Sequence, residues 1–192
     1  MRSVRGRVWV FGNDLSTDLI LPGSVQGPIK LGRAGPETVV SHCLRAIRPG
    51  WHVHVRPGDI IVGGRNFGCG SSRPAHLVLQ AMGIGAVVAE SVARLFFRNC
   101  INAGLVAISC PSILDLVAEG DELELNLVDG IAYNLTKGSI TRFAPLPEDS
   151  PPSQILRAGG LIPYMEQVFG GAQKGDRPPD AVSLGVKLPD LD

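Results

Sequence analysis

The chain has 192 residues, with 18 Lys and Arg against 18 Asp and Glu and a hydrophobic fraction of 44%. This length and apolar content can fill one globular core, and the formal net charge of zero supplies no field that would gather nucleic acid or an anionic membrane surface. The N-terminus lacks the apolar core of a signal peptide, and no apolar run approaches the roughly 20 residues of a membrane span. We therefore expect a soluble, cytoplasmic protein with neither nucleic-acid nor membrane partners.

The cysteines are widely spaced, and no two of them form a CxxC pair; they are Cys43, Cys69, Cys100 and Cys110. This spacing is typical of reduced thiols in the cytosol rather than of a disulfide framework or of a metal site contained in one chain. We therefore expect no metal ligands in this chain, and any cluster or zinc ion would be held elsewhere.

The pattern of apolar residues predicts strands and helices in chain order. Residues 3–12 alternate with a period of two, which predicts a half-buried strand, and residues 36–47 carry apolar residues at helical spacing. In the stretch WHVHV, His52 and His54 are expected to share one face of a strand, with no third metal ligand beside them.

From Asp59 onward the chain alternates short apolar strands with helices. The strands are expected at residues 59–64, 86–90 and 105–110, and the helices at residues 74–83, 91–104 and 111–120. This alternation indicates buried, largely parallel strands with helices packed on them.

Residues 121–143 again alternate with a period of two, on both sides of Asp129-Gly130, a dipeptide typical of hairpin turns. Two helical stretches, around residues 153–160 and 161–170, complete the fold. We therefore predict one α/β domain over residues 1–169, with a parallel βαβ core and an antiparallel hairpin. Residues 170–192 are rich in Gly, Pro and charge, so we expect this tail to be disordered or bound to a partner.

The stretch GRNFGCGSSRPAH, residues 64–76, joins a predicted strand to a predicted helix. Its glycines let a ligand approach the backbone, and the helix N-terminus beside Ser71 and Ser72 supplies unpaired N–H groups and a partial positive charge. Arg73 adds a planar fork of donors that matches a carboxylate or a phosphate. The loop therefore predicts an anion site; the alternative is that one serine only caps the helix and that Arg73 is a surface charge.

Known phosphate-binding loops match this stretch incompletely. It has no lysine for a P-loop and no G-x-S-x-G for a nucleophile elbow. The dinucleotide-binding fingerprint matches in part, because Gly68 and Gly70 have its spacing and Glu90 follows about 20 residues later, where a ribose-binding acid is expected. Arg73 replaces its third glycine. A dinucleotide-binding domain and a non-catalytic anion-binding module are therefore kept as alternatives.

The motif NFGCGSSR, residues 66–73, resembles the small subunit of 3-isopropylmalate dehydratase, the equivalent of the swivelling domain of aconitase. The similarity continues through AVVAESVARLFFRNCINAGL, EGDELELNL, NLTKG and AGGL, and it spans residues 6–165. The resemblance implies a swivelling β/β/α domain of the aconitase C-terminal type. It also implies a heterodimeric hydro-lyase of leucine biosynthesis, in which a separate large subunit holds a 4Fe-4S cluster and this chain ligates none.

The resemblance implies roles for residues of the loop. Ser71 would be the base that removes a proton from the carbon next to a carboxylate. Arg73 would bind a substrate carboxylate, and Ser72 and Gly70 would also bind substrate. The further residues expected at the pocket are Asn66, Thr17 and Asp18. The implied substrate is a 2- or 3-hydroxy dicarboxylic acid, isopropylmalate or a related alkylmalate.

Two stretches depart from the family pattern. Residues 73–76 read Arg-Pro-Ala-His where family members read Arg-Glu-His-Ala, and residues 23–36 replace the Ala-Arg-Tyr-Leu that usually follows TDxIxP. The second stretch bears on the substituent that the diacid carries. The sequence therefore leaves open whether the substrate is isopropylmalate, methylmalate, dimethylmalate or a homocitrate-type acid.

Overall fold

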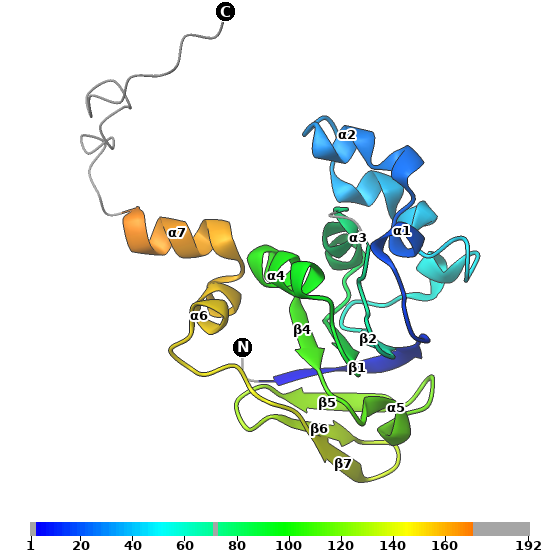
Figure 1. The fold of residues 1–192 in the computed structure, drawn as a ribbon, viewed down its shortest axis with the longest axis vertical. Coiled ribbons are helices and arrows are strands. Elements are labelled where there is room, and N and C mark those ends of the chain that lie inside the picture. The colour runs from blue at the N-terminus through cyan, green and yellow to red at the C-terminus, as the bar shows by residue number, and fades with distance from the viewer. Residues whose placement is uncertain (1–2, 71–72, 171–192) are drawn as a thin grey trace, which may run out of the picture.

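The structure is a computed structural model that describes residues 3–70 and 73–170. The strands in these residues form one mixed sheet in the order β4-β3-β2-β1-β5-β6-β7 (Figure 1). Their bounds are β1 (Ser3–Val10), β2 (Ile60–Gly63), β3 (Ala86–Ala89), β4 (Val106–Ser109), β5 (Glu122–Asn126), β6 (Ile131–Asn134) and β7 (Ser139–Arg142). Strands β1 to β4 pair in parallel, whereas β1 pairs antiparallel with β5, β5 with β6, and β6 with β7. The parallel and antiparallel halves of the sheet therefore meet at β1.

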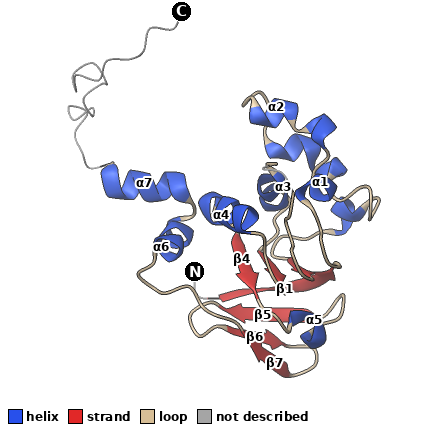
Figure 2. Cartoon of the chain, viewed as in Figure 1, coloured by secondary structure: helices blue, strands red, loops and turns tan. Residues whose placement is uncertain are grey.

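Helices cover both faces of the parallel half. Helix α3 follows β2 and α4 follows β3, whereas α5 contacts β2, β3 and β7 from the other face. Helices α6 and α7 lie beside α4, away from the antiparallel strands (Figure 2). The α-helices are α1 (Thr17–Ile20), α2 (Gly27–Lys30), α3 (Ala75–Ala81), α4 (Arg94–Ala103), α5 (Ile113–Leu116), α6 (Pro151–Ala158) and α7 (Leu161–Phe169). None of the helices in the described residues is long and apolar enough to cross a bilayer.

The parallel strands are buried on both faces, which explains their continuous apolar sequences. Ile61 and Val87 point into a core formed with α3 and α4. Val62, the next residue along β2, points to the opposite face and belongs to a second core with Ile113 of α5. This second core continues to Leu123 of β5, so it also lies under the antiparallel half. Two cores, one on each face of the sheet, therefore hold the parallel strands in place, and the strands position the loops that follow them.

Carboxylates on both sides of β1 hold the two halves of the sheet together. Asp59 is 3% exposed just before β2, and its Oδ2 accepts hydrogen bonds from Arg7 Nη2 and Trp9 Nε1, both on β1, at 2.7 Å each. Burial alone would raise the pKa of Asp59, but the bonds from Arg7, the Arg56 N–H and Trp9 outweigh it, and the pKa is lowered. On the other side of β1, Arg5 donates to Glu122 of β5 at 2.8 Å, and this bond lowers the pKa of Glu122. We call these contacts across β1 the β1 seam.

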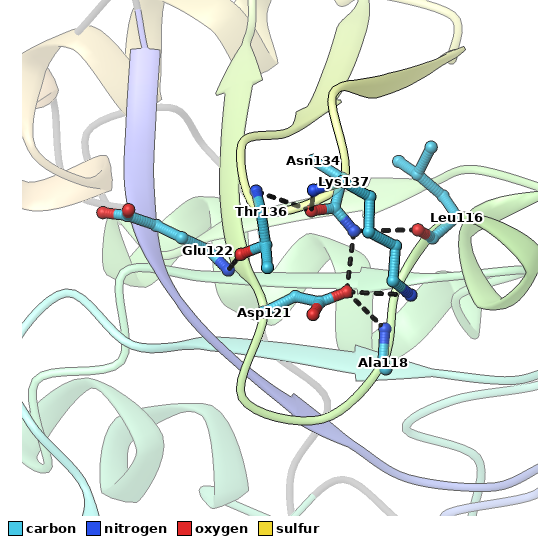
Figure 3. Close-up of polar contacts among 7 residues, drawn as sticks. All are labelled: Leu116, Ala118, Asp121, Glu122, Asn134, Thr136 and Lys137. Atoms are coloured by element: carbon cyan, nitrogen blue, oxygen red, sulfur yellow. Dashed lines mark hydrogen bonds and ion pairs between the residues drawn. The ribbon is translucent and has the colours of Figure 1, made fainter.

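A buried asparagine ties the antiparallel half to α5 (Figure 3). Asn134 is fully buried at the end of β6, and its Nδ2 donates to Leu116 O at 2.9 Å and to Asp121 Oδ2 at 2.7 Å. Its Oδ1 accepts from the two backbone N–H groups that open the following turn, at 3.0 Å each. Asp121 also accepts from the Ala118 N–H at 2.8 Å and pairs with Lys137 at 3.0 Å. These contacts, the Ala118 bond first, lower the pKa of Asp121.

The structure confirms the predicted parallel core and the hairpin at Asp129-Gly130, and it adds a second turn that separates β6 from β7. The helix expected over residues 36–47 is wrong: a 3₁₀ helix, η2 (Pro36–His42), forms there, and Leu44 adopts a left-handed conformation with a φ of 54°. The tail expected beyond the domain lies outside the described residues from position 171 onward.

The strand expected at WHVHV is also wrong, because residues 51–54 form a 3₁₀ helix, η3 (Trp51–His54). Trp51 is 1% exposed and packs edge-on against Trp9 and Phe11, with ring centroids 5.8 and 5.6 Å away. Gly50, with a φ of 76°, turns the chain into this position. The packing of one buried indole therefore outweighs the alternating pattern, which by itself favours a strand.

Candidate active site

The candidate residues lie where the parallel strands deliver their loops to one edge of the sheet. Residues 11–16 follow β1, residues 64–74 follow β2, and residues 90–93 follow β3. Because these three strands are neighbours and parallel, their carboxyl ends bring the loops side by side. The carboxyl edge of a parallel sheet is the usual position of a ligand site in α/β proteins.

Backbone hydrogen bonds join the three loops. The N–H groups of Asp14 and Gly68 each pair with a carbonyl across the first two loops at 2.8 Å, and the Thr17 N–H bonds to Cys69 O at 2.8 Å. On the other side, the Phe67 N–H bonds to Ser91 O at 2.9 Å. The loop after β2 is therefore held on both sides by main-chain atoms, whose geometry does not depend on the side chains they carry.

Asn66 connects the first two loops through its side chain. Its Nδ2 donates to Asp14 Oδ1 at 2.9 Å, and both residues are in the left-handed region, with φ values of 59° and 53°. Asn and Asp tolerate this region better than other non-glycine residues, because their short polar side chains bond locally. The side chain of Asn66, which sequence analysis expected at the pocket, is thus engaged in fixing the loop.

Gly70 brings the loop against the start of α1. Its φ is 98°, and a Cβ at this position would lie 3.5 Å from Thr17 Oγ1 and 3.8 Å from Asp18 Oδ1. Thr17 is 3% exposed and Asp18 is in the first turn of α1. The structure therefore brings together three of the residues that the sequence assigned to the site.

Arg73 reaches the same position from the other end of the loop. Its Nε donates to Asp18 Oδ1 in an ion pair, and its side chain is 18% exposed against 52% for Asp18. Nη1 of Arg73 is buried and has no hydrogen-bond partner among the described residues. Ser71 and Ser72, the two residues between Gly70 and Arg73, lie outside the described residues.

The Arg73 guanidinium lies against Gly23, at the start of a 3₁₀ helix, η1 (Gly23–Val25). A Cβ at Gly23 would overlap Nη1 and would lie 3.2 Å from both Cζ and Nη2. Sequence analysis missed Gly23, because its contribution is the space left by a missing side chain 50 residues from Arg73. The one signal in the sequence is its position directly after the TDLILP segment that holds Asp18.

His76 is close in sequence to Arg73 but adds no positive charge at neutral pH. Burial lowers the pKa of its imidazole to about 4, and its buried Nδ1 has no hydrogen-bond partner among the described residues. The ring is therefore neutral near pH 7. His76 therefore adds no positive charge to that of the Arg73 guanidinium at neutral pH.

The described residues supply no ligand set for a metal. Among residues 3–70 and 73–170, no three His, Cys, Asp or Glu side chains come together in a way that could hold an ion. Cys43, Cys100 and Cys110 are buried as free thiols, and burial raises the pKa of Cys43 to about 12. The described part of the chain therefore does not fit an iron-sulfur cluster.

Glu90, the acid of the dinucleotide-binding alternative, lies at a separate place. It lines a hollow with Asn13, Arg65 and Ser91, whereas Arg73 contacts Asp18 and Gly23. The parallel strands also run in the order β4-β3-β2-β1, without the reversal of the 3-2-1-4-5-6 order of dinucleotide-binding sheets. An apolar pocket of about 410 Å³, between β4, the segment after β7 and α6, contains none of the candidate residues.

Comparison with known proteins gives the family. The isopropylmalate/citramalate isomerase small subunit of Methanocaldococcus jannaschii is 47% identical over 175 residues, which cover 90% of this chain and 100% of that protein. The chain belongs to the family of 3-isopropylmalate dehydratase small subunits. A family member of this name from Heliobacterium modesticaldum is 41% identical, over 84% of this chain and 93% of that protein.

The fold agrees with this family. A crystal structure of 3-isopropylmalate dehydratase from Methanocaldococcus jannaschii matches with a TM-score of 0.77 and 36% identity, covering 86% of this chain and 95% of that one. The aconitase C-terminal domain family matches residues 51–112, the segment from η3 to the start of α5 that includes Arg73. The predicted fold class is therefore confirmed, and the chain is a subunit of a hydro-lyase.

Proposed function

We propose that this chain is the small subunit of a heteromeric iron-sulfur hydro-lyase that isomerises a hydroxy dicarboxylic acid by removing and returning water. The substrate is isopropylmalate or a related alkylmalate. Relatives named for isopropylmalate and for citramalate, which is 2-methylmalate, support this substrate class. The observation that carries the proposal is the guanidinium of Arg73, which pairs with Asp18 at the start of α1 and lies against Gly23.

Arg73 binds a carboxylate of the substrate in this proposal. Asp18 accepts a hydrogen bond from Nε and leaves Nη1 as a donor. Nη1 has no partner among the described residues, and a buried donor without a partner costs free energy that a bound carboxylate would recover. The low exposure of the Arg73 side chain strengthens such a bond, because less water screens the charge.

Ser71 removes the proton from the carbon next to this carboxylate. A serine hydroxyl is a poor base unless its alkoxide is stabilised, and Arg73 two residues later places a guanidinium in the same loop. Gly70, with its left-handed backbone, leaves no side chain between this loop and α1. Both features support the assignment of Ser71, and Ser72 is assigned to substrate binding in this proposal.

The large subunit supplies the cluster. The names of the relatives as small subunits support a division of the active site between two chains. When bound, a 4Fe-4S cluster would act as a Lewis acid toward the substrate hydroxyl. The residues of this chain bind and orient the diacid and move its proton.

Reconstitution tests the proposal. The chain is mixed with its cognate large subunit under anaerobic conditions, and C4 to C7 hydroxy diacids are screened by the absorbance of the unsaturated product. We expect activity with the mixture and none with either subunit alone. Dehydratase activity of the purified chain by itself, or a complex inactive with every diacid, would contradict the proposal.

The Ser71→Ala variant tests the base. We expect kcat of the reconstituted enzyme to fall by about 10²-fold or more, because general-base catalysis contributes about that factor. Ser139→Ala, on the far strand β7, is the matched control and should leave kcat unchanged. Near-wild-type turnover by the Ser71→Ala enzyme would exclude Ser71 as the base while leaving the assignment of the subunit intact.

A further inference from the structure

Strand β4 forms one end of the sheet, and no described strand pairs with its outer edge. On its inner side it pairs in parallel with β3 along its whole length. An edge strand presents a row of unpaired N–H and C=O groups, and proteins commonly cover such an edge with another segment of chain. A further strand can therefore add to the sheet at β4.

The apolar pocket of about 410 Å³ lies along this edge. Every residue of β4 lines it, together with Phe97, which packs against one core of the sheet, and Phe143, which belongs to the other. A pocket that reaches both cores and the whole of β4 lies where the sheet ends. Val128 also lines the pocket and is 55% exposed, so apolar surface is open to a further segment there.

The sequence beyond α7 contains one segment with the pattern of a half-buried strand. Residues 182–188 read VSLGVKL, with Val or Leu at every even position and Ser, Gly or Lys between them. A period of two places the apolar side chains on one face of a strand and the others on the opposite face. The composition rich in Gly, Pro and charge belongs mainly to residues 170–181, which precede this segment.

Residues 170–181 are long enough to bring this segment back to β4. Helix α7 begins beside the start of β4, because Gly104, two residues before that strand, packs against Gly159 and Gly160 at the junction of α6 and α7. The nine residues of α7 span about 14 Å. The 12 residues that follow reach up to about 40 Å when extended. The linker therefore exceeds the length of α7 more than twofold.

We propose that residues 182–188 add to the sheet as a strand beside β4 of the same chain, with their even-numbered side chains in the apolar pocket. Main-chain hydrogen bonds to the free edge hold the strand, and the apolar side chains cover Val128 and Phe143. The short linker favours the chain's own segment over that of a second copy, because it keeps the local concentration near the millimolar range. None of the described candidate residues lines the pocket, so the inference does not depend on the proposed function.

Hydrogen exchange of the full wild-type chain, followed by mass spectrometry of peptic peptides, is the first test. We expect the amides of residues 183–188 to exchange about tenfold or more slowly than those of a free peptide of the same sequence. The protection should survive about a hundredfold dilution, since the contact is within one chain. Exchange at the rate of the free peptide would overturn the inference. Protection that is lost on dilution, or that requires the large subunit, would overturn it in favour of a second copy or of that partner.

Leu184→Asp tests the face on which the segment binds. The charge would enter the apolar pocket, so we expect the protection of residues 183–188 to be lost. Ser183→Asp is the matched control, because it introduces the same charge one position away, on the opposite face, and should keep the protection of the wild type. Equal exchange in the two variants would contradict a strand with its even-numbered side chains in the pocket.

Val128→Asp tests the pocket itself, and Val53→Asp is its control. Both valines are exposed in the described residues, at 55% and 68%, so neither change should disturb the fold. Val128 lines the pocket, whereas Val53 lies on η3, outside it. We expect the amides of residues 183–188 to exchange about tenfold or more faster in Val128→Asp and at the wild-type rate in Val53→Asp. A segment that stays protected in Val128→Asp would show that it binds elsewhere and would overturn the inference.

Discussion

At the scale of single residues, the candidate site depends on the hydrogen-bond donors of one arginine and on the volume that nearby glycines leave free. Arg73 supplies the donors, Asp18 orients them, and the glycines at positions 23 and 70 leave room around them. The two glycines act differently, because Gly70 needs its left-handed backbone and Gly23 does not.

Replacement of Arg73 by lysine tests the need for a planar fork. We expect Arg73→Lys to raise KM of the reconstituted enzyme by about tenfold or more, because an ammonium group keeps the charge but loses the paired, directed donors. Arg142→Lys on the exposed side of β7 is the control and should change neither KM nor kcat. Equal KM values for the Arg73→Lys and wild-type enzymes would show that charge alone is sufficient at this position.

The cysteines predict an order of chemical reactivity. Burial raises the pKa of Cys43 to about 12 and also raises the pKa of Cys100 and Cys110, so the thiolate is scarce and shielded at all three. Cys69 is partly exposed in the loop beside Gly70. Iodoacetamide at pH 8 should therefore alkylate Cys69 about tenfold faster or more than the others, as followed by mass spectrometry of the peptides. Comparable rates at Cys69 and Cys43 would contradict this burial pattern.

At the scale of elements, the sequence predicts well those segments that packing and local preference favour together. The strands β2, β3 and β4 are predicted because apolar runs of this length are needed when both faces of a sheet are covered. The hairpin at Asp129-Gly130 is predicted because Gly130 takes the left-handed φ, 65°, that such a turn needs. The 3₁₀ helix η3 is not predicted from the sequence, because Trp51 is buried against Trp9 and Phe11, which lie about 40 positions earlier in the chain.

The same limit applies to the candidate site. Gly70 and Arg73 are predicted because the glycines and the arginine stand in one short motif whose chemistry is visible locally. Asp18 is expected at the pocket, but its ion pair with Arg73 requires the fold, and Gly23 has no chemical group that could be noticed. A residue that contributes only the volume left by a missing side chain therefore cannot be recognised from the sequence. A residue that contributes a hydrogen-bond donor or acceptor can be.

The turn after β6 predicts a contrast between two asparagines. Asn134 is fully buried and bonds Leu116, Asp121 and the next turn, whereas Asn126 makes similar local bonds in exposed surroundings. We expect Asn134→Ala to lower the free energy of unfolding by about 3 kcal/mol, since buried partners lose their bonds, and Asn126→Ala by about 1 kcal/mol or less. Urea denaturation measures both, and equal losses would show that the buried contacts carry no extra stability.

At the scale of the whole molecule, β1 is the strand on which the two halves of the sheet depend. It pairs in parallel with β2, whose loop carries Arg73, and antiparallel with β5, whose half contains none of the candidate residues. The buried Asp59 on one side and Glu122 on the other bond arginines of β1. The ionisation of these carboxylates therefore links pH to the cohesion of the entire sheet.

This link gives a prediction for acid stability. The pKa values of Asp59, Asp121 and Glu122 are lower in the folded chain than their ordinary values, so the unfolded chain binds more protons in acid. Their stabilisation is complete above the ordinary carboxyl pKa of about 4 and is lost as the pH falls through the lowered values. The free energy of unfolding should therefore fall steadily between about pH 5 and pH 2, as measured by urea denaturation at each pH.

Asp59→Asn identifies the contribution of the β1 seam to this pH dependence. We expect the difference in unfolding free energy between the wild type and Asp59→Asn to be largest near pH 7 and to shrink toward pH 2, because the wild type then loses the same charge. Asp149→Asn, at an exposed position between β7 and α6, is the control and should leave the slope unchanged. A constant difference across the pH range would exclude Asp59 as a source of the acid sensitivity.

The main-chain bonds between the three loops have a consequence for how such a protein diversifies. Since Asp14, Thr17, Phe67 and Gly68 hold the loops with N–H groups that every residue except proline carries, mutations of neighbouring side chains leave the framework in place. Under the proposed function, preference for a longer or shorter alkyl group on the diacid can then change over generations without loss of the folded scaffold. If the proposed function holds, a directed-evolution library confined to residues 24–36, with the loop junctions kept, should yield variants with new diacid preferences.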